Sequence, residues 1–299
     1  MSPSTPSAAQ NLAGITAALV SSLTLIINDV LTKTAAETLP TSEIIVLRGF
    51  AGMVMIMIAA PFLGDPGIRS IRWMLKPVVS LRVFSEVGAT ILYLTALFHL
   101  PIASATMIQQ TLPLAVTAGA ALFLGAVVGW RQWLAIGVGF LGVAIILRPG
   151  PEGIDVWMLV ALAAVAFMTL RDLATRVMPA AISTLSITLL TMMATVALGL
   201  VLSAREPWVM PSLTTVAILV AAAFFLILGF FFLIASLRDA DVAIVAPFRY
   251  STVLWAIVAG YLVWGDVPDM PTLAGAGIVI VAGLYTVHRQ RIARRRAGG

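Results

Sequence analysis

Long apolar segments recur along the whole chain, and their length restricts the possible folds more than any other feature. A helix rises about 1.5 Å per residue, so about 20 apolar residues cross the roughly 30 Å hydrocarbon core of a bilayer. Ten such segments can be marked, at about Leu12–Leu31, Glu43–Phe62, Val78–Leu97, Ile102–Gly125, Trp133–Leu147, Val156–Ala174, Ile182–Leu202, Leu213–Ala235, Val242–Trp264 and Leu273–Val287. The sequence therefore predicts an all-α polytopic membrane protein with ten transmembrane helices.

The composition supports this fold class. Only 10% of the 299 residues are charged and 61% are hydrophobic, whereas a soluble protein carries about 25% charged residues. The chain has no cysteine, which excludes disulfides and thiolate metal sites. The first eleven residues contain no Lys or Arg, so the first segment is expected to be a retained span and not a cleaved signal peptide.

The basic residues predict the orientation. The pI of about 10.2 reflects a basic tail, HRQRIARRR, which is typical of the cytoplasmic flank of a last span that touches anionic lipid. We therefore expect the bilayer, and no nucleic acid, as the partner of this charge. With the N-terminus inside, the inner connections hold twelve of the 18 basic residues, namely Arg69, Arg72, Lys76, Arg131, Arg171, Arg176, Arg238 and the five tail arginines. The outer side holds only Lys33, Arg148 and Arg205. Both termini are predicted to be cytoplasmic, in a bacterial-type inner (plasma) membrane.

The second half of the chain repeats landmarks of the first half at an offset of 140 residues. The matching pairs are Ala103/Ala243, Gly125/Gly265 and Gly137/Gly277. We expect a first five-helix repeat at 1–148, a linker at 149–155, a second repeat at 156–290 and a basic tail at 291–299. An odd number of spans inverts the second copy, and inverted repeats are the recurring architecture of secondary transporters, with the site between the copies. Two repeats in one chain also favour a monomer.

One arginine is predicted to lie near the middle of the bilayer, where a charge costs the most free energy. Arg249 follows Asp241 by eight residues, about 12 Å along a helix and so near mid-membrane. Pro247 removes a backbone donor just before it. A buried arginine beside a broken helix is tolerated only among protein partners or around a water-filled cavity, which indicates a solute pathway.

The third span carries three polar residues on one face. At about 100° per residue, Arg82, Glu86 and Tyr93 fall within about 40° of one another. Glu86 lies at the same depth as Arg249, and pairing with Arg249, or with Arg82 one turn away, lowers the cost of these charges. Two interpretations remain: a structural ion pair, or a carboxylate and a guanidinium that bind substrate.

The fourth span offers a counterpart to Arg249 and Tyr250. At the offset of 140, Gln109 and Gln110 correspond to these two residues, and each span has an internal proline close by. Matching polar groups in two interrupted helices are typical of a site at a repeat interface. The alternative is that the glutamines only join neighbouring helices by hydrogen bonds.

The outer end of the pathway has its own polar residues. Asn28 belongs to a polar stripe in the first span, and Asp29 follows it. Asp29 and Arg48 are candidates for an outer-gate pair, although snorkelling to the interface explains both as well. Arg171, Asp172 and Arg176 end the sixth span, and we interpret them mainly as determinants of topology.

Enzyme motifs are absent from the sequence. There is no GxxxxGK[ST] phosphate loop, no HExxH metal motif and no GxSxG nucleophile elbow. No catalytic residue, metal site or cofactor is therefore expected.

The sequence, and especially the last spans of each half, resembles the EamA-type drug/metabolite transporters. The segments that carry the resemblance are Arg48-Gly-Phe-Ala-Gly, Tyr93-Leu-Thr-Ala-Leu, Trp264-Gly265-Asp266 and the Gly277…Gly283 span. After Gly125 the acidic residue usual in the family is missing, since Ala126 and Val127 stand there.

Within this family the chain is similar to bacterial exporters of aromatic and other neutral amino acids. This likeness implies export of a zwitterion by alternating access. Arg249 would bind its carboxylate, Glu86 or Asp29 its ammonium, and Tyr93, Tyr250 and Trp255 its side chain. The alternatives are another metabolite or a cationic drug as the cargo, or a membrane scaffold or sensor that transports nothing.

Overall fold

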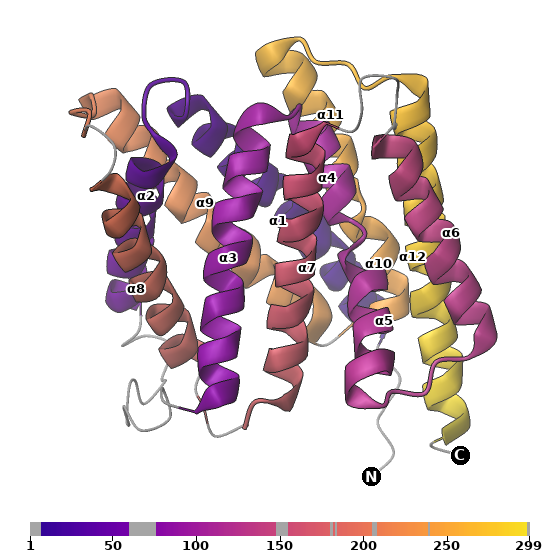
Figure 1. The fold of residues 1–299 in the computed structure, drawn as a ribbon. Helices are drawn as coiled ribbons and strands as arrows, with labels where there is room; N and C mark the ends of the chain where they lie inside the picture. The colour runs from indigo at the N-terminus through magenta and orange to yellow at the C-terminus, as the bar shows by residue number, and fades with distance from the viewer. Residues whose placement is uncertain are drawn as a thin grey trace.

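The fold is a bundle of helices, seen in a computed structural model that describes residues 7–59, 76–147, 155–179, 182, 184–204, 208–238 and 240–297. Its elements are α1 (Ala8–Ala35), α2 (Thr41–Ala59), α3 (Pro77–His99), α4 (Ile102–Gln109), α5 (Leu112–Leu124), α6 (Trp130–Leu147), α7 (Val156–Val177), α8 (Thr184–Ser203), α9 (Leu213–Arg238), α10 (Val242–Arg249), α11 (Ser251–Trp264) and α12 (Met270–Ala297). The described residues form no strand. Figure 1 shows the helices crossing the bundle from one end to the other.

Within the described ranges, ten spans are long and apolar enough to cross a membrane, which confirms the predicted fold class. The fourth span consists of α4 and α5, and the ninth of α10 and α11. The fifth and tenth spans begin three residues earlier than expected because side chains cap them. Gln132 accepts a hydrogen bond from the Gly129 backbone, and Asp269 accepts one from the Thr272 backbone.

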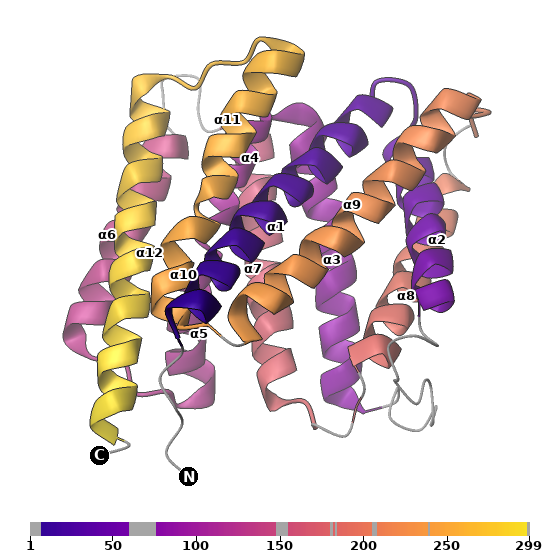
Figure 2. The ribbon, with the colours of Figure 1, turned by 180° about the vertical axis from the view of Figure 1, so that it is seen from behind.

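Both ends of the chain approach the same face of the bundle. The start of α1 and the end of α12 lie together at the bottom of Figures 1 and 2. We call this the inner end, following the predicted orientation, and the opposite end, where α1 finishes, the outer end. The large apolar side chains exposed on the bundle, such as Phe123 and Leu262, are those expected to face lipid.

In the last two spans of each half, several element boundaries match at the offset of 140 residues. The helix starts and ends that match are Ile102 and Val242, Leu124 and Trp264, and Trp130 and Met270. After each central span the chain turns through a glycine with positive φ, 66° at Gly125 and 72° at Gly265. Only glycine adopts this left-handed conformation without a steric cost from Cβ.

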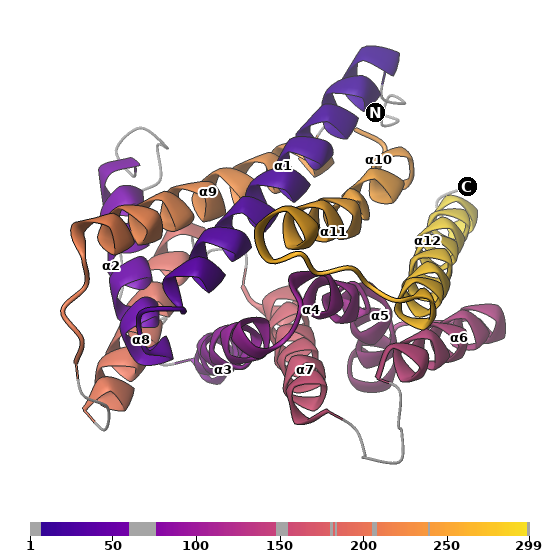
Figure 3. The same cartoon turned by 90° about the horizontal axis from the view of Figure 1, so that it is seen from above.

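Helices pack mainly across the two repeats. The most extensive contacts join α1 to α9 and α3 to α7. In each of these two pairs, the first span of one half packs against the third span of the other half. The next most extensive contacts join α6 to α12 and α2 to α8. Figure 3 shows the α2–α8 pair and the α6–α12 pair at opposite edges of the bundle, with α4 and α11 between them. The core joins both halves: Ile26, Leu94, Met107 and Val253 belong to one buried cluster.

Glycines allow α6 and α12 to approach closely. A Cβ on Gly142 would lie 2.8 Å from the Gly275 carbonyl oxygen, and a Cβ on Gly275 would lie 2.6 Å from the Gly142 carbonyl oxygen. Without a hydrophobic driving force between helices in lipid, such backbone contact supplies much of the packing energy.

Candidate functional site

Two interrupted spans lie face to face between the repeats. α4 gives way to α5 at Gln110 and Thr111, and α10 gives way to α11 at Tyr250, which is 140 residues after Gln110. Pro113 lacks the N–H that would bond a carbonyl in the turn before it, so the ladder opens there. Hydroxyl groups partly replace the lost bonds: Thr111 donates to the Ile108 carbonyl at 2.7 Å. Polar side chains and freed carbonyls therefore meet in the middle of the bundle.

A buried polar cluster lies toward the outer end, and we call it the outer cluster. Its members are Asn28, Asp29 and Thr32 of α1, Arg48 of α2 and Tyr93 of α3. The Tyr93 hydroxyl donates to Oδ2 of Asp29 at 2.7 Å, and the Asn28 amide donates to Oδ1 at 2.9 Å. Nη1 of Arg48 donates to Oδ1 of Asn28 at 3.3 Å and to the Thr32 hydroxyl at 3.4 Å. Asn28, Asp29 and Thr32 are all at most 9% exposed, so this network satisfies groups that lipid could not.

A second cluster, the inner cluster, lies toward the other end. Its members are Arg82 and Glu86 of α3, Arg171 and Asp172 of α7, and Thr191 of α8. Glu86 pairs with Arg82 at 3.5 Å and with Arg171 at 3.2 Å, and Arg171 also pairs with Asp172 at 2.8 Å. Nη1 of Arg82 donates to the Thr191 hydroxyl at 2.8 Å. The two cations and two carboxylates compensate each other, which lowers the cost of holding them within the span.

The two clusters occupy matching places in the two repeats. Asp172 follows Asp29 by 143 residues, and Thr191 follows Arg48 by the same 143 residues. Because the second repeat is inverted, positions near the outer end of the first half correspond to positions near the inner end of the second half. The bundle thus carries a buried polar cluster toward its outer end and a partly buried one toward its inner end, on either side of the interrupted spans.

Two expectations about pairing can be compared with these contacts. Of the two partners expected for Glu86, the structure confirms Arg82 and not Arg249, and it adds Arg171. Asp29 and Arg48 form no direct ion pair within 4.0 Å in the described structure; Asn28 stands between them and bonds both. The Arg48 guanidinium instead donates to the Asn28 amide oxygen and to the Thr32 hydroxyl.

Arg171 and Asp172 were missed as site residues, because their place near a span end suited a role in topology. Their side chains are only 19% and 36% exposed, and Arg171 is the bridge between α7 and α3. The signal that would have found them is their match with Asn28 and Asp29 in the other repeat.

The remaining candidates lie around the two interruptions. Gln109 points to α7, where its amide lies 3.8 Å from the sulfur of Met168, and Gln110 caps α4. The ring of Tyr250 rests against Gly283 of α12, in space that a Cβ there would fill.

Arg249 ends α10 and is exposed within the structure. Its backbone carbonyl accepts a hydrogen bond from Ser22 of α1 at 3.3 Å and from Thr252 at 2.8 Å. Asp172 of the inner cluster attracts the Arg249 guanidinium electrostatically, but no ion pair within 4.0 Å includes Arg249 among the described residues. This guanidinium therefore adds a positive charge within electrostatic reach of Asp172.

The outer ends of three spans are tied together by what we call the outer clasp, made of Lys33, Glu37, Leu100 and Trp264. The Lys33 ammonium donates to the Leu100 carbonyl and lies 5.1 Å from the centre of the Trp264 ring. The Trp264 indole donates to Glu37 at 3.1 Å. These contacts join α1 to the start of α4 and to the end of α11.

In the described part of the chain, no group of three or more His, Asp or Glu side chains is placed to hold a metal ion. A ten-span bundle of two inverted repeats, interrupted at its centre and lined by buried charge, defines a membrane transporter. The EamA-like transporter family matches residues 12–148 and 155–287, and the chain belongs to this family.

Curated relatives match nearly the whole chain. An S-adenosylmethionine uptake transporter of Rickettsia prowazekii is 26% identical over 280 residues, covering 94% of each chain. The pseudopaline exporter CntI of Pseudomonas aeruginosa is 28% identical over 90% of this chain and 94% of the relative. A riboflavin transporter of Vibrio cholerae is 28% identical over 82% of each. One crystal structure shares the fold, with a TM-score of 0.63 and 19% identity over 96% of this chain and 98% of that one.

Proposed function

We propose that this protein is a secondary transporter of a bacterial-type plasma membrane that exports small metabolites by alternating access, with both termini in the cytoplasm. The favoured cargo is an amino acid, or a metabolite that carries an ammonium and a carboxylate. The single observation that carries the proposal is Arg249, an exposed residue at the end of α10 that has no ion-pair partner among the described residues and lies within electrostatic reach of Asp172.

The charge pattern supports a zwitterionic cargo. Arg249 has no ion-pair partner among the described residues, so a substrate carboxylate can bind it without displacing a protein group. Among the described residues, Asp29 accepts hydrogen bonds from neutral donors alone, namely Tyr93 and Asn28. A substrate ammonium would therefore give Asp29 the close cationic partner that Arg48 does not provide.

The relatives support transport of small organic solutes and differ in direction. The names of two of them give uptake for one and export for the other. The proposal of export rests on the overall likeness of the sequence to amino-acid exporters of this family, and the experiment must decide the direction of transport.

The test is a flux panel with purified protein in liposomes. Neutral amino acids, S-adenosylmethionine and riboflavin are each offered to both sides of the membrane, and initial rates are compared with empty liposomes. We expect flux of an amino-acid-type solute that Arg249→Ala abolishes, while Arg176→Ala, at the inner end of α7, leaves it intact. Flux of riboflavin alone would reassign the cargo, and no flux of any solute would favour a scaffold or sensor.

Orientation has an independent test, because the chain contains no cysteine of its own. A single cysteine at Val267, between α11 and α12, is expected to react with an impermeant maleimide added to intact cells. A cysteine at Ala297 should react only after the membrane is opened. The reverse pattern would invert the proposed topology.

A further inference from the structure

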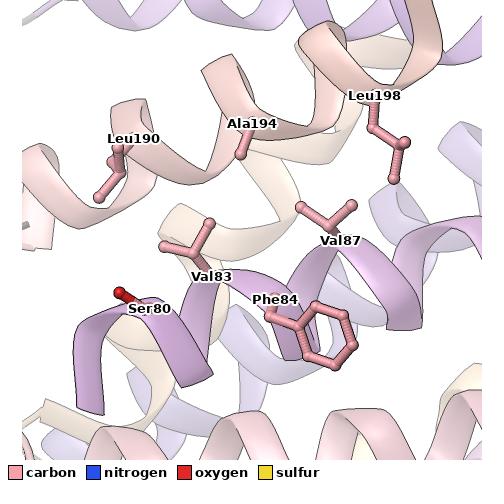
Figure 4. A pocket seen from close by; sticks show the side chains of 7 residues that line it. All are labelled: Ser80, Val83, Phe84, Val87, Leu190, Ala194 and Leu198. Carbon is pink, nitrogen blue, oxygen red and sulfur yellow. The ribbon is translucent and has the colours of Figure 1, made fainter. Parts of the chain in front are cut away.

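An apolar slot opens between α3 and α8, the two helices that the Arg82–Thr191 hydrogen bond of the inner cluster also joins. Its volume is about 370 Å³, within the range of small-molecule sites. Six apolar side chains and one hydroxyl line it, as Figure 4 shows; they are Ser80, Val83, Phe84 and Val87 of α3 and Leu190, Ala194 and Leu198 of α8.

The slot lies on the lipid side of α3. At about 100° per residue, its four lining residues on this helix fall roughly 80–180° from the face that carries Arg82, Glu86 and Tyr93. Phe84 is 63% exposed, as expected of a residue at the mouth of a site that opens outward. The slot is therefore separate from the region assigned to the cargo.

Its shape and depth suit a hydrocarbon chain. From Ser80 to Val87 the slot runs roughly 10 Å along α3, and from Leu190 to Leu198 roughly 12 Å along α8. One leaflet contributes about half of the roughly 30 Å core. The slot thus begins in the leaflet at the inner end of the bundle, with Ser80 nearest the headgroups, and its α8 side extends up to Leu198.

Positive charge stands at the headgroup end. Lys76, exposed at the N-terminal cap of α3, precedes Ser80 by one helical turn. The N-terminus of a helix adds a partial positive charge, and the predicted topology assigns most of the basic residues of the chain to this side. An apolar slot below a cationic rim is complementary to an anionic lipid with a phosphate above an acyl chain.

We propose that the slot binds one acyl chain of an anionic phospholipid, whose headgroup phosphate lies beside Lys76. The bound chain fills the seam between α3 and α8. The same seam carries the 2.8 Å hydrogen bond from Arg82 to Thr191, which joins the inner cluster to α8. The lipid therefore holds together the two helices that support this cluster, and it does so without contacting the cargo.

The first experiment asks where a lipid binds on the unaltered protein. Purified protein is placed in bilayers of phosphatidylglycerol, or of phosphatidylcholine, that contain a photoactivatable acyl chain, and crosslinked peptides are identified. We expect crosslinks in α3 and α8 that are several-fold stronger with phosphatidylglycerol. Equal labelling by both lipids would overturn the anionic headgroup, and labelling only on other helices would overturn the site.

The second experiment fills the slot. Ala194→Phe places a ring where the acyl chain would lie, while Leu200→Phe makes the same kind of change at an exposed apolar position of α8 outside the slot. Native mass spectrometry should show retained phosphatidylglycerol falling at least fivefold in the first variant and unchanged in the second. Unchanged retention of phosphatidylglycerol in Ala194→Phe would refute the proposal. If that variant does not fold, the same measurement is made on Ala194→Leu.

The headgroup contact is tested with Lys76→Gln, which should remove the preference for phosphatidylglycerol over phosphatidylcholine and leave binding of the chain. A preference that survives would remove Lys76 from the site. Each of these readouts measures lipid binding, so a failure here leaves the transport proposal standing, and an absence of transport leaves this one standing.

Discussion

Tyr93 and Asp29 are joined across α3 and α1 by a 2.7 Å hydrogen bond from the phenol to the carboxylate. With the Asn28 amide on the other oxygen, this bond leaves Asp29 held by neutral donors although Arg48 is part of the same network. A buried carboxylate in this state is well placed to exchange a neutral donor for a cation that arrives with the cargo.

Tyr93→Phe tests this bond, because it removes the hydroxyl and keeps the ring. A hydrogen bond to a charged group contributes about 1.5–3 kcal/mol, so we expect cargo affinity to change by at least tenfold. Asp29→Asn should abolish flux of a cationic or zwitterionic solute. Initial rates in liposomes measure both variants; a Tyr93→Phe protein with native affinity would show that the phenol only fills space.

Arg171 should matter far more than its neighbour Arg176. Arg171→Gln leaves Glu86 with the single, longer pair to Arg82, and breaking a buried ion pair costs several kcal/mol. We expect a large loss of both thermal stability and flux. Arg176→Gln, at an exposed position one turn on, serves as the matched control.

A charge-swap variant tests whether Glu86 and Arg171 stabilise the protein by pairing with each other. In Glu86→Arg with Arg171→Glu the bridge between α3 and α7 can form in reverse, so the double variant should be more stable than either single variant. Melting temperatures in detergent measure this. Additive losses would contradict the pair as a source of stability.

Gly142 is expected to tolerate no larger residue. Gly142→Leu would drive a side chain into the Gly275 backbone of α12, whereas Gly137→Leu, on the same helix, meets nothing within 4 Å. The first change should lower the melting temperature strongly or prevent folding. The second should be neutral or slightly stabilising, since leucine favours helix over glycine by up to about 1 kcal/mol.

Lys33→Ala should open the outer clasp. Thr32, fully buried next to it, is then expected to become accessible from outside when replaced by cysteine. Labelling by an impermeant maleimide should rise several-fold over the same cysteine in an otherwise native chain. A cysteine at exposed Val267 should be labelled equally in both backgrounds and so controls for expression.

The fold could be predicted well from the sequence because the thickness of a bilayer sets the length of an apolar segment that spans it. The interruptions were also foreseeable, since Pro113 and Pro247 stand beside polar residues in two spans that match. Both features depend on the order of residues along one helix, which is what a sequence records.

The pairing of charges was harder to predict because it depends on directions between helices. Counting residues placed Glu86 and Arg249 at one depth, but depth does not say which helix faces which. α3 lies against α7, so Arg171 reaches Glu86 first. In the outer cluster, the counted depths of Asp29 and Arg48 were compatible with a direct pair, and only the placement of Asn28 between them decides otherwise.

The packing of helices between the two halves restricts how the protein can be produced. Each half leaves its main partner surfaces uncovered, since α1 needs α9 and α3 needs α7. Produced as two polypeptides, the halves would have to enter the membrane in opposite orientations and in equal amounts before either could complete its fold. Their fusion settles stoichiometry and orientation together, so the protein amounts to an obligate antiparallel dimer encoded as one chain.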